Sequence, residues 1–452
     1  NSKPITKSTT TKNSEFMINT KENLLDKVAN REAKLSVIGL GYVGLPLSIA
    51  FAQAGIEVIG IDVDARKVSM LNAGQSYVED VADSQLLPLV QAGSFRASTN
   101  FADLMQVDAI AICLPTPLGE TKDPDISFII NATDNIAHYG ATGKLVILES
   151  TTYPGTTEEI ILPRLSHNGD HVGRDFFLAF SPERIDPGRT DYNMFNTPKV
   201  IGGVTPDCLE VALALYGTVV QHPVPVSSTA TAEMVKLLEN TFRAVNIGLV
   251  NEIALMCDKL GLDVWEVVGA AATKPYGFMP FYPGPGLGGH CIPVDPHYLS
   301  WKLRTLNYTA RFIELAHDIN SHMPDYVVDK VALGLNEARK AVNGSKVLVL
   351  GVAYKPNIGD VRESPAIDVI DLLEERGAEV SYHDPYVADF VAAGISFHSI
   401  ELTQAALEQA DCVVIVTNHA DYDWDFITNH AQLIVDSRNA IKGKSKSRVV
   451  RL

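Results

Sequence analysis

A glycine-rich turn between an apolar strand and a helix constrains the fold of this chain most. Gly39, Gly41 and Gly44 form the pattern GLGYVG directly after the apolar run LSVI, and a second apolar run, EVIGI, ends at Asp62. A strand, turn and helix of this kind typically bind a dinucleotide. The first glycine permits the tight turn, the second lets the pyrophosphate approach the helix N-terminus, and the third lets helix and strand pack closely.

Asp62 bears on which dinucleotide is bound. Its carboxylate would hydrogen-bond the adenosine ribose diol and repel a 2′-phosphate, so NAD is favoured over NADP. Arg66 and Lys67 lie close behind it and weaken this preference. The alternative is that Asp62 only caps the helix that follows.

Short apolar segments alternate with helical patterns along most of the chain. They lie at 35–39, 57–62, 107–114, 144–150 and 176–181, and again at 346–354, 378–384, 411–419 and 432–439. Such alternation indicates parallel sheets covered by helices. Between the two sets, an apolar-periodic run without proline, from Ser228 to Leu260, predicts one helix of about 30 residues. The expected fold class is α/β: two Rossmann-like doubly wound domains joined by a long central helix and a helical middle domain.

The expected domain boundaries follow from this pattern. Residues 1–30, rich in Ser, Thr, Lys and Asn, predict a flexible N-terminal tail with a short helix beginning near Glu22. A cofactor-binding domain is expected at 31–227, a helical domain at 228–335 and a second α/β domain at 336–452. Within the helical domain, 11 of the 24 residues at 273–296 are Pro or Gly, and a loop of this length is usually functional.

Charge and cysteine content exclude some classes of function. The 37 Lys and Arg residues against 54 Asp and Glu give a net charge of −17, with no dense basic stripe, so nucleic-acid and membrane-surface binding are disfavoured. Five widely spaced cysteines, with no CxxC pair and no leading signal peptide, favour a reducing cytoplasm. The weakly charged stretch from Leu35 to Val63 holds five glycines and fits a buried strand, helix and strand better than a membrane span.

Cys291 differs from the other cysteines in its surroundings. It follows two glycines in the sequence GLGGHCIPVDP, where the backbone can approach a ligand closely, and His290, Asp295 and His297 supply titratable neighbours. A nucleophile and an inert thiol are both open from spacing alone. A metal site is not expected here, because no second Cys or His pair stands at ligand spacing. Cys113, Cys257 and Cys412 lie on expected strands or a helix and fit buried, inert positions.

Three further polar residues are candidates for the chemistry. Lys236 and Asn240 stand four residues apart on the long helix and project from one face, although an ordinary solvated face gives the same pattern. Glu183 follows an expected strand in FSPERIDPG, at the edge where doubly wound sheets place their ligands. It is a candidate acid or base.

Other loops at strand ends carry hydroxyl and basic groups. Thr116, in PTP, and Thr151, in ESTT, follow two expected strands and would line the nicotinamide half of the cofactor. Lys355 and Arg362 lie on the loop after KVLVLG, which is either a surface loop with scattered charges or a diphosphate-binding loop.

Together these motifs resemble those of the UDP-glucose/GDP-mannose dehydrogenase family. The matching segments, in chain order, are GLGYVGLP, PTP, ESTTYPGTT, SPERIDPG, AEMVKLLENT, GPGLGGHCIPVDP, GVAYKPNIGDVRESP and VDSRN. The resemblance runs from about Lys34 to the C-terminus. It implies NAD-dependent oxidation of a nucleotide sugar's C6 hydroxyl to a carboxylate in two steps, with two NAD⁺ and one water.

The resemblance also implies a role for each candidate residue. Lys236 and Asp295, with an ordered water, would accept the proton of the alcohol, and Asn240 would donate a hydrogen bond to the same oxygen. Cys291 would attack the aldehyde and carry a thiohemiacetal and then a thioester. Glu183 and Thr151 would activate and orient the hydrolytic water.

Binding residues follow in the same way. The residues implied for NAD are Gly39, Gly41, Tyr42, Val43, Gly44, Asp62, Lys67, Thr116, Thr151 and Arg362. Those implied for the UDP-sugar are Glu183, Arg184, Lys236, Asn240, Tyr282, Gly288 and Lys355, with the UDP on the C-terminal domain. A homo-oligomer, either a dimer built on the long helix or a larger assembly, is also expected.

Two departures from the UDP-glucose branch bear on the substrate. A second Glu common in that branch is Pro187 here, and a Lys three residues after the cysteine is Val294. The flanking motifs look instead like the branch that oxidises UDP-N-acetylhexosamines for surface polysaccharides. UDP-N-acetylglucosamine is the first expectation; the manno and galacto epimers and UDP-glucose are rivals. More distant alternatives are a two-electron hydroxyacid dehydrogenase and a non-catalytic NAD-binding regulator.

Overall fold

The computed structural model describes residues 20–452 except 79, 120–122, 167–168, 185–190, 393 and 444. The chain divides into two compact units, which are described one at a time. Unit 1 comprises residues 1–119 and 124–236, and unit 2 comprises residues 120–123 and 237–452. Pro187 and the second half of the SPERIDPG motif, from residue 185 on, lie outside the described residues.

Unit 1 is built on an eight-stranded sheet in the order β3-β2-β1-β4-β5-β6-β7-β8. The strands are β1 (Lys34–Ile38), β2 (Glu57–Ile61), β3 (Phe95–Ser98), β4 (Ala109–Ile112), β5 (Leu145–Leu148), β6 (Phe177–Phe180), β7 (Lys199–Gly203) and β8 (Pro223–Val226). The first six are parallel, in the 3-2-1-4-5-6 order of a Rossmann fold, and β7 runs antiparallel to β6.

Helices cover both faces of this sheet. They are α1 (Thr20–Ala29), α2 (Gly44–Gln53), α3 (Ala65–Asn72), α4 (Asp83–Gln91), η1 (Phe101–Gln106), α5 (Ser127–Tyr139), η2 (Thr157–Ile161), α6 (Leu162–Leu165) and α7 (Pro206–Tyr216). Because both faces are buried, the central strands are continuous apolar runs rather than alternating ones.

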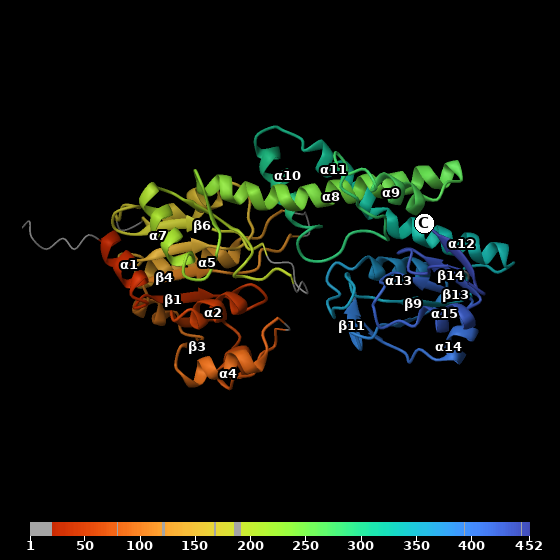
Figure 1. Cartoon of the computed structure of the whole chain (residues 1–452), viewed down its shortest axis with the longest axis horizontal. Helices are drawn as coiled ribbons and strands as arrows, with labels where there is room; N and C mark the ends of the chain where they lie inside the picture. The colour runs from red at the N-terminus through yellow and green to blue at the C-terminus, as the bar shows by residue number, and fades with distance from the viewer. Residues whose placement is uncertain are drawn as a thin grey trace, which may run out of the picture. The chain divides into compact units, whose positions relative to one another are not determined.

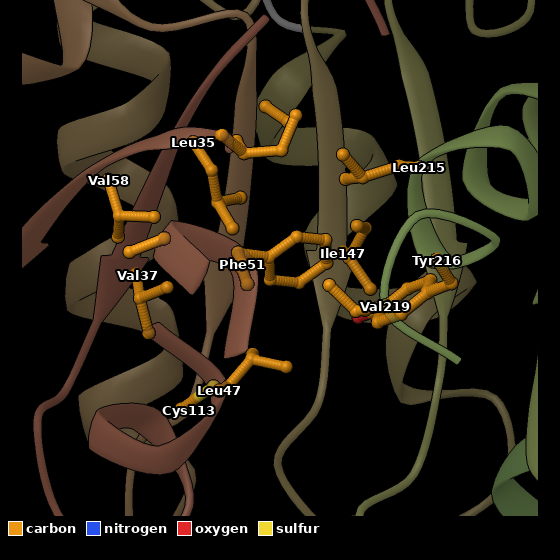
Figure 2. Close-up of a cluster of buried hydrophobic side chains, with 14 of the residues drawn as sticks. Leu35, Val37, Leu47, Phe51, Val58, Cys113, Ile147, Leu215, Tyr216 and Val219 are labelled. Atoms are coloured by element: carbon orange, nitrogen blue, oxygen red, sulfur yellow. The ribbon is translucent and has the colours of Figure 1, made fainter. Parts of the chain in front are cut away.

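One face of the sheet packs against α2 and α7 (Figure 2). Leu35 and Val37 of β1 point to this face, where Phe51 of α2 and Tyr216 of α7 meet with ring centroids 5.8 Å apart. The neighbouring residue Ile38 points to the other face, which α5 covers. The sheet is therefore the middle layer of a doubly wound unit.

Residues 20–29, within the range expected as an N-terminal tail, form a helix. Helix α1 begins at Thr20 and buries Leu24 and Val28 in the core under α2 and α7, so an apolar contact orders this segment. Residues 1–19 lie outside the described part of the chain.

The long helix predicted from Ser228 to Leu260 is confirmed as α8 (Thr229–Leu260), which runs without a break (Figure 1). The division between the two units falls within it, after Lys236. No helix of the described residues is long and apolar enough to span a membrane.

Unit 2 contains helices followed by a second parallel sheet. The helices are α9 (Val264–Ala271), α10 (Asp295–Thr305), α11 (Arg311–Ser321), α12 (Met323–Glu337), α13 (Pro365–Glu375), α14 (Gln404–Gln409) and α15 (Trp424–His430). The strands are β9 (Lys346–Leu350), β10 (Glu379–His383), β13 (Cys412–Ile415), β14 (Leu433–Asp436) and β15 (Arg448–Arg451), with a separate hairpin of β11 (Asp389–Ala392) and β12 (Ile395–His398).

The second sheet has the order β10-β9-β13-β14-β15, which is the 2-1-3-4-5 order of the other common doubly wound fold. Helices α12 and α13 cover one face, and α14 and α15 cover the other. The expected fold class is confirmed: two doubly wound α/β folds, a long helix and a helical segment between them.

Candidate active site

In the glycine turn after β1, a side chain would find space at Gly41 but not at Gly39 or Gly44. A Cβ at Gly39, which has φ +92°, would lie 2.5 Å from the carbonyl oxygen of Cys113, and a Cβ at Gly44 would lie 1.8 Å from the carbonyl oxygen of Gly39. At Gly41 a Cβ would meet nothing within 4 Å. The turn is therefore closed against β4 and its helix but open at Gly41, at the N-terminal end of α2, which is what a bound pyrophosphate requires.

Asp62 contacts this turn directly. Its carboxylate accepts hydrogen bonds of 3.0 Å from the backbone N–H of Leu40 and of Asp64. The cap of α3 is Asp64, whose side chain accepts from the N–H of Arg66, so capping is not the role of Asp62. A carboxylate at this position, beside the open turn, fits the ribose of NAD.

Lys67 and an unforeseen tyrosine border the same turn. The Lys67 ammonium lies 5.4 Å from the ring centroid of Tyr77, and the Tyr77 hydroxyl donates a 2.6 Å hydrogen bond to the carbonyl of Leu40. Burial, and then the negative charges of Asp62 and Asp64, raise the pKa of Tyr77, so the hydroxyl stays a donor. Nothing in the spacing of the sequence singled out Tyr77.

Thr116 and Thr151 meet at the carboxyl ends of neighbouring strands. The Thr116 hydroxyl donates a 2.8 Å hydrogen bond to the carbonyl of Thr151, and the N–H of Leu114 donates to the hydroxyl of Ser150 at 2.9 Å. The loops after β4 and β5 are thus held together beside the glycine turn after β1. This edge, where the strand order reverses between β1 and β4, is where doubly wound sheets bind their ligands.

Glu183 lies just after β6 with two lysines around it. One carboxylate oxygen accepts a 2.7 Å hydrogen bond from the backbone N–H of Arg184, and the other lies 3.5 Å from the ammonium of Lys199. Lys236 of α8 donates a 2.8 Å hydrogen bond to the backbone carbonyl of Glu183. The structure brings Glu183, Arg184 and Lys236 together and adds Lys199, which sequence reasoning missed.

In unit 2, Asn240 and Asp295 form a buried pair. The Asn240 amide donates a hydrogen bond to the carboxylate of Asp295, and both residues are almost fully buried. Arg243, one turn further along α8, donates to the amide oxygen of Asn240 at 3.1 Å. That bond fixes which end of the Asn240 amide faces the carboxylate. Asp295 opens α10, so helix geometry holds it in place.

Cys291 precedes α10 and is held by its first turn. Its backbone carbonyl accepts hydrogen bonds from the N–H groups of Val294, at 3.2 Å, and Asp295, at 2.8 Å. All five cysteines lie among the described residues and remain thiols, and Cys291 is the exposed one. Burial, and then the charge of Glu149, raise the pKa of the Cys113 thiol, and burial raises that of Cys412. Of the five thiols, Cys291 is the one that exposure leaves accessible to a reactant.

Glycines allow the Cys291 loop to lie on the loop after β9. A Cβ at Gly288 or Gly289 would come within 2.6 or 2.7 Å of the Tyr354 side chain. The N–H of Gly289 donates a 3.0 Å hydrogen bond to the carbonyl of Arg362. The predicted residues Gly288, Cys291 and Arg362 are thereby placed on two loops in direct contact, and Lys355 follows Tyr354.

Arg362 and Tyr282 already have structural contacts. The guanidinium of Arg362 is paired with Asp360, with Nη2 and Oδ2 2.6 Å apart. The Tyr282 ring is exposed and stacks on Trp265 with centroids 6.1 Å apart. Each side chain is therefore held by a neighbour within the protein, and neither contact by itself indicates a ligand.

Arg438 is a candidate that sequence reasoning did not assign, although it stands in the VDSRN motif. It follows β14, its Nε donates to the carbonyl of Val416 at 2.8 Å, and burial lowers its pKa to about 10. A Cβ at Gly284 would lie 2.5 Å from its Nη1, so the guanidinium touches the loop that leads to Cys291. A half-buried guanidinium at the carboxyl end of a strand suits an anion.

The fold and these loops define a class of protein: a dehydrogenase with one nucleotide-binding α/β fold for its cofactor and a second for a nucleotide. Comparison with protein families agrees. Residues 33–220 match the NAD binding domain, 230–322 the central domain and 348–443 the UDP binding domain of the UDP-glucose/GDP-mannose dehydrogenase family. The chain belongs to that family. It is an NAD-dependent nucleotide-sugar dehydrogenase.

Named relatives cover nearly the whole chain. A UDP-N-acetyl-D-mannosamine dehydrogenase of Pyrococcus horikoshii is 36% identical over 90% of this chain and 96% of its own. A UDP-N-acetyl-D-glucosamine 6-dehydrogenase of Pseudomonas aeruginosa is 33% identical, over 87% of this chain and 92% of its own. The solved structure of a UDP-D-ManNAc dehydrogenase from Pyrococcus horikoshii superposes with a TM-score of 0.85 at 34% identity, covering 92% of this chain and 98% of that one.

Proposed function

We propose that this enzyme oxidises the C6 hydroxyl of a UDP-N-acetylhexosamine to the uronic acid, in two oxidations that consume two NAD⁺ and one water. The observation that carries the proposal is the exposed Cys291 thiol at the start of α10, whose first helical residue, Asp295, is hydrogen-bonded to Asn240. A two-electron dehydrogenase has no use for a nucleophile there.

The cofactor would be held by the open turn at Gly41, by Asp62 and Lys67, and by Thr116. The family resemblance also assigns Arg362 to the cofactor. NAD⁺ supplies the hydride acceptor for both oxidations. The free space at Gly41 and the carboxylate beside it support this assignment.

In the first oxidation the alcohol must lose its proton. We assign this to Lys236 and Asp295 acting through an ordered water, with the amide of Asn240 donating a hydrogen bond to the developing oxyanion. Lys236 and Asn240 stand one turn apart on α8, and Asp295 is bonded to Asn240, which supports a shared task.

In the second oxidation Cys291 carries the sugar. Its thiolate adds to the aldehyde carbon and the carbonyl oxygen takes up a proton, giving a thiohemiacetal. Loss of the C6 hydride and of that proton leaves a thioester on Cys291. The aldehyde therefore stays bound throughout.

Hydrolysis of the thioester needs a base and an oriented water. Thr151 orients the water and Glu183 takes its proton as the water oxygen bonds to the thioester carbon. The carbon–sulfur bond then breaks, which frees the Cys291 thiolate and gives the uronate product. Arg184, Tyr282, Gly288 and Lys355 would hold the sugar and the diphosphate, and the half-buried guanidinium of Arg438 would add a further contact to an anion.

The acetamido sugar is proposed from motif resemblance and from the relatives. UDP-N-acetylglucosamine is the substrate we would test first, and UDP-N-acetylmannosamine is the second candidate, because relatives of similar identity carry each name. One inverted hydroxyl is read by contacts worth a few kcal/mol, about 1–3, which overall identity does not report. The uronate would serve a surface polysaccharide made from cytoplasmic precursors.

We also propose that a second copy of this chain packs on α8. Leu238, Phe242, Leu249 and Met256 are exposed and follow each other at steps of four, seven and seven residues, so they line one face of the helix. A stripe at this period suits a helix of a second chain.

The test is NADH production from limiting UDP-N-acetylglucosamine, UDP-N-acetylmannosamine, UDP-N-acetylgalactosamine and UDP-glucose, with wild type and Cys291→Ala. We expect two NADH per sugar from one acetamido substrate, and a loss of turnover of at least about a thousandfold in the variant. One NADH per sugar in the wild type would contradict the four-electron reaction. Full turnover of UDP-glucose alone would contradict the choice of sugar.

A further inference from the structure

A buried cluster of charges lies behind Glu183 in unit 1. Lys199 begins β7, and its ammonium donates a 2.8 Å hydrogen bond to the carboxylate of Glu149, at the end of β5. The same ammonium lies 3.5 Å from the carboxylate of Glu183 and 3.3 Å from the carbonyl of Pro182. The Tyr216 hydroxyl donates to the second oxygen of Glu149.

These groups have little contact with solvent. The side chains of Lys199 and Glu149 are 5% and 0% exposed, while that of Glu183 is 14% exposed. Burying an ion pair costs desolvation that an apolar pair would avoid, and the strands around it are otherwise apolar. Packing therefore gives no reason for the pair, whereas its contact with Glu183 does.

We propose that Lys199 is a positioning residue for Glu183, and that Glu149 sets how much of the Lys199 charge acts on the Glu183 carboxylate. This inference rests on the proposed function, in which Glu183 is the base that hydrolyses the Cys291 thioester. One cation shared by two carboxylates orients Glu183 and keeps it ionised without making it too weak a base.

The electrostatics agree with this division of charge. Burial works against the Lys199 cation, but the charges of Glu149 and Glu183 outweigh burial and raise its pKa, so it stays protonated. Burial raises the pKa of Glu149, and Lys199 opposes that effect. Among the described residues, the titratable or charged groups around Glu183 include Lys199 of β7, Glu149 after β5, Cys113 after β4, Tyr216 of α7, Lys236 of α8 and the adjacent Arg184.

Two variants should shift the pKa of Glu183 in opposite directions. In Glu149→Gln the whole Lys199 charge acts on Glu183, so the pKa of Glu183 falls and the acidic limb of the hydrolysis rate moves to lower pH. In the double variant Glu149→Gln/Lys199→Met both buried charges are removed, so the limb moves to higher pH. We expect shifts of about half a pH unit or more each way. Lys199→Arg keeps the cation and should stay near wild type.

The experiment measures thioester hydrolysis in a single turnover at pH 5.5 to 9. Holoenzyme with NAD⁺ and the UDP-sugar is quenched at intervals, and the Cys291 adduct is followed by intact-protein mass spectrometry while NADH is counted in the same samples. Lys144→Met is the matched control. That half-buried lysine donates to the carbonyl of Gly140, away from these carboxylates, and its removal should leave the limb in place.

The outcomes separate this inference from the proposed function. Opposite shifts, with two NADH per sugar, support the role of Lys199. Equal slowing at every pH with no shift overturns it and leaves the proposed function intact. If the double variant does not fold, the Glu149→Gln variant is sufficient. An acidic limb that stays in place or moves to higher pH in that variant overturns the role of Lys199. A wild type with one NADH per sugar and no adduct overturns the proposed function instead.

Discussion

The glycines of the turn after β1 face different surroundings, and this difference separates binding from folding. At Gly44 an added methyl group would collide with the backbone of Gly39, which neither residue can relieve by a side-chain rotation. At Gly41 the same methyl group would stand in free space and in a backbone conformation open to other residues. It would occupy the room through which a pyrophosphate reaches the N–H groups of α2.

Gly41→Ala should therefore weaken NAD⁺ binding without unfolding the protein. We expect the Kd for NAD⁺ to rise at least about tenfold, with a midpoint of thermal unfolding within about 2 °C of wild type. Gly44→Ala should lower that midpoint by several degrees as well as weaken binding. Calorimetric titration and thermal unfolding of both variants check this. A Gly41→Ala enzyme with unchanged affinity would contradict the position assigned to the cofactor.

The sequence alone predicted only some of the residues of the candidate site. GLGYVG and Asp62 predicted a dinucleotide turn because their roles depend on backbone geometry within one short segment. Lys199 and Tyr77 were missed because each acts on a partner far along the chain, at Glu183 and Leu40. Their contacts exist only once the strands are paired, and no spacing within the sequence reports them.

At the scale of elements, the buried carboxylate of Asp384 holds the loop after β9 in place. Both oxygens of Asp384 are used: they accept hydrogen bonds from the N–H groups of Val352, at 2.7 Å, Ala353, at 3.1 Å, and Tyr386, at 2.8 Å. His419, after β13, lies 3.0 Å from the same carboxylate. Asp384 thus ties together the loops at the point where the strand order reverses, next to Lys355.

Asp384→Asn should loosen this edge of the second sheet. The amide would turn donors toward backbone N–H groups, and we expect a loss of about 2–4 kcal/mol in the free energy of unfolding of unit 2. Urea unfolding at pH 7, followed by tryptophan fluorescence, measures it; the three tryptophans, Trp265, Trp301 and Trp424, all belong to unit 2. Asp389→Asn, at the exposed start of β11, is the control and should change little. An unchanged midpoint in Asp384→Asn would contradict the anchoring role.

This loss should also depend on pH. Burial acts to raise the pKa of Asp384, but the hydrogen bonds from His419 and the backbone outweigh burial and lower it. A carboxyl group with a lowered pKa contributes its stability above its unfolded pKa, about 3.9, and loses it as the pH falls through the folded value. The gap between wild type and Asp384→Asn should be full at pH 6–7 and shrink below about pH 4. A gap that grows as the pH falls would contradict this.

Strands with unbroken apolar runs were predictable, whereas strands interrupted by proline, glycine or a charge were harder to predict. Six strands with unbroken apolar runs, namely β4, β5, β6, β9, β13 and β14, stand out because both faces of their sheets are buried. Helix α8 stands out by the length of its apolar period without proline. The edge strand β8 has the sequence PVPV. Its prolines argue against a strand in a sequence-based prediction, although an edge strand tolerates them. Strand β7 begins with the buried Lys199 and ends in two glycines, so its composition hid it.

At the scale of the whole molecule, α8 holds the proposed residues Lys236 and Asn240 and also exposes apolar side chains. Leu249 and Met256 are 55% and 46% exposed on the part of α8 that belongs to unit 2. Exposed apolar side chains at a constant helical period are what an interface between chains would cover.

Met256→Glu and Leu249→Glu together should therefore yield single chains. A charge on each copy of a two-fold interface is buried against its own image, which opposes association. Light scattering after size exclusion measures the mass. The control is Met105→Glu on η1, which is 61% exposed in unit 1 and should leave the mass unchanged. A wild type that is already a single chain would contradict the proposed second copy.

The central claim is that the sugar is oxidised while attached to Cys291. The most direct test incubates Glu183→Gln with NAD⁺ and the UDP-N-acetylhexosamine that supports turnover, and then measures the intact protein mass. We expect an adduct with the mass of the bound uronyl nucleotide sugar, located on the peptide that contains Cys291 and absent from Cys291→Ala. Two NADH per sugar with no adduct in Glu183→Gln, and unimpaired turnover in that variant, would contradict it.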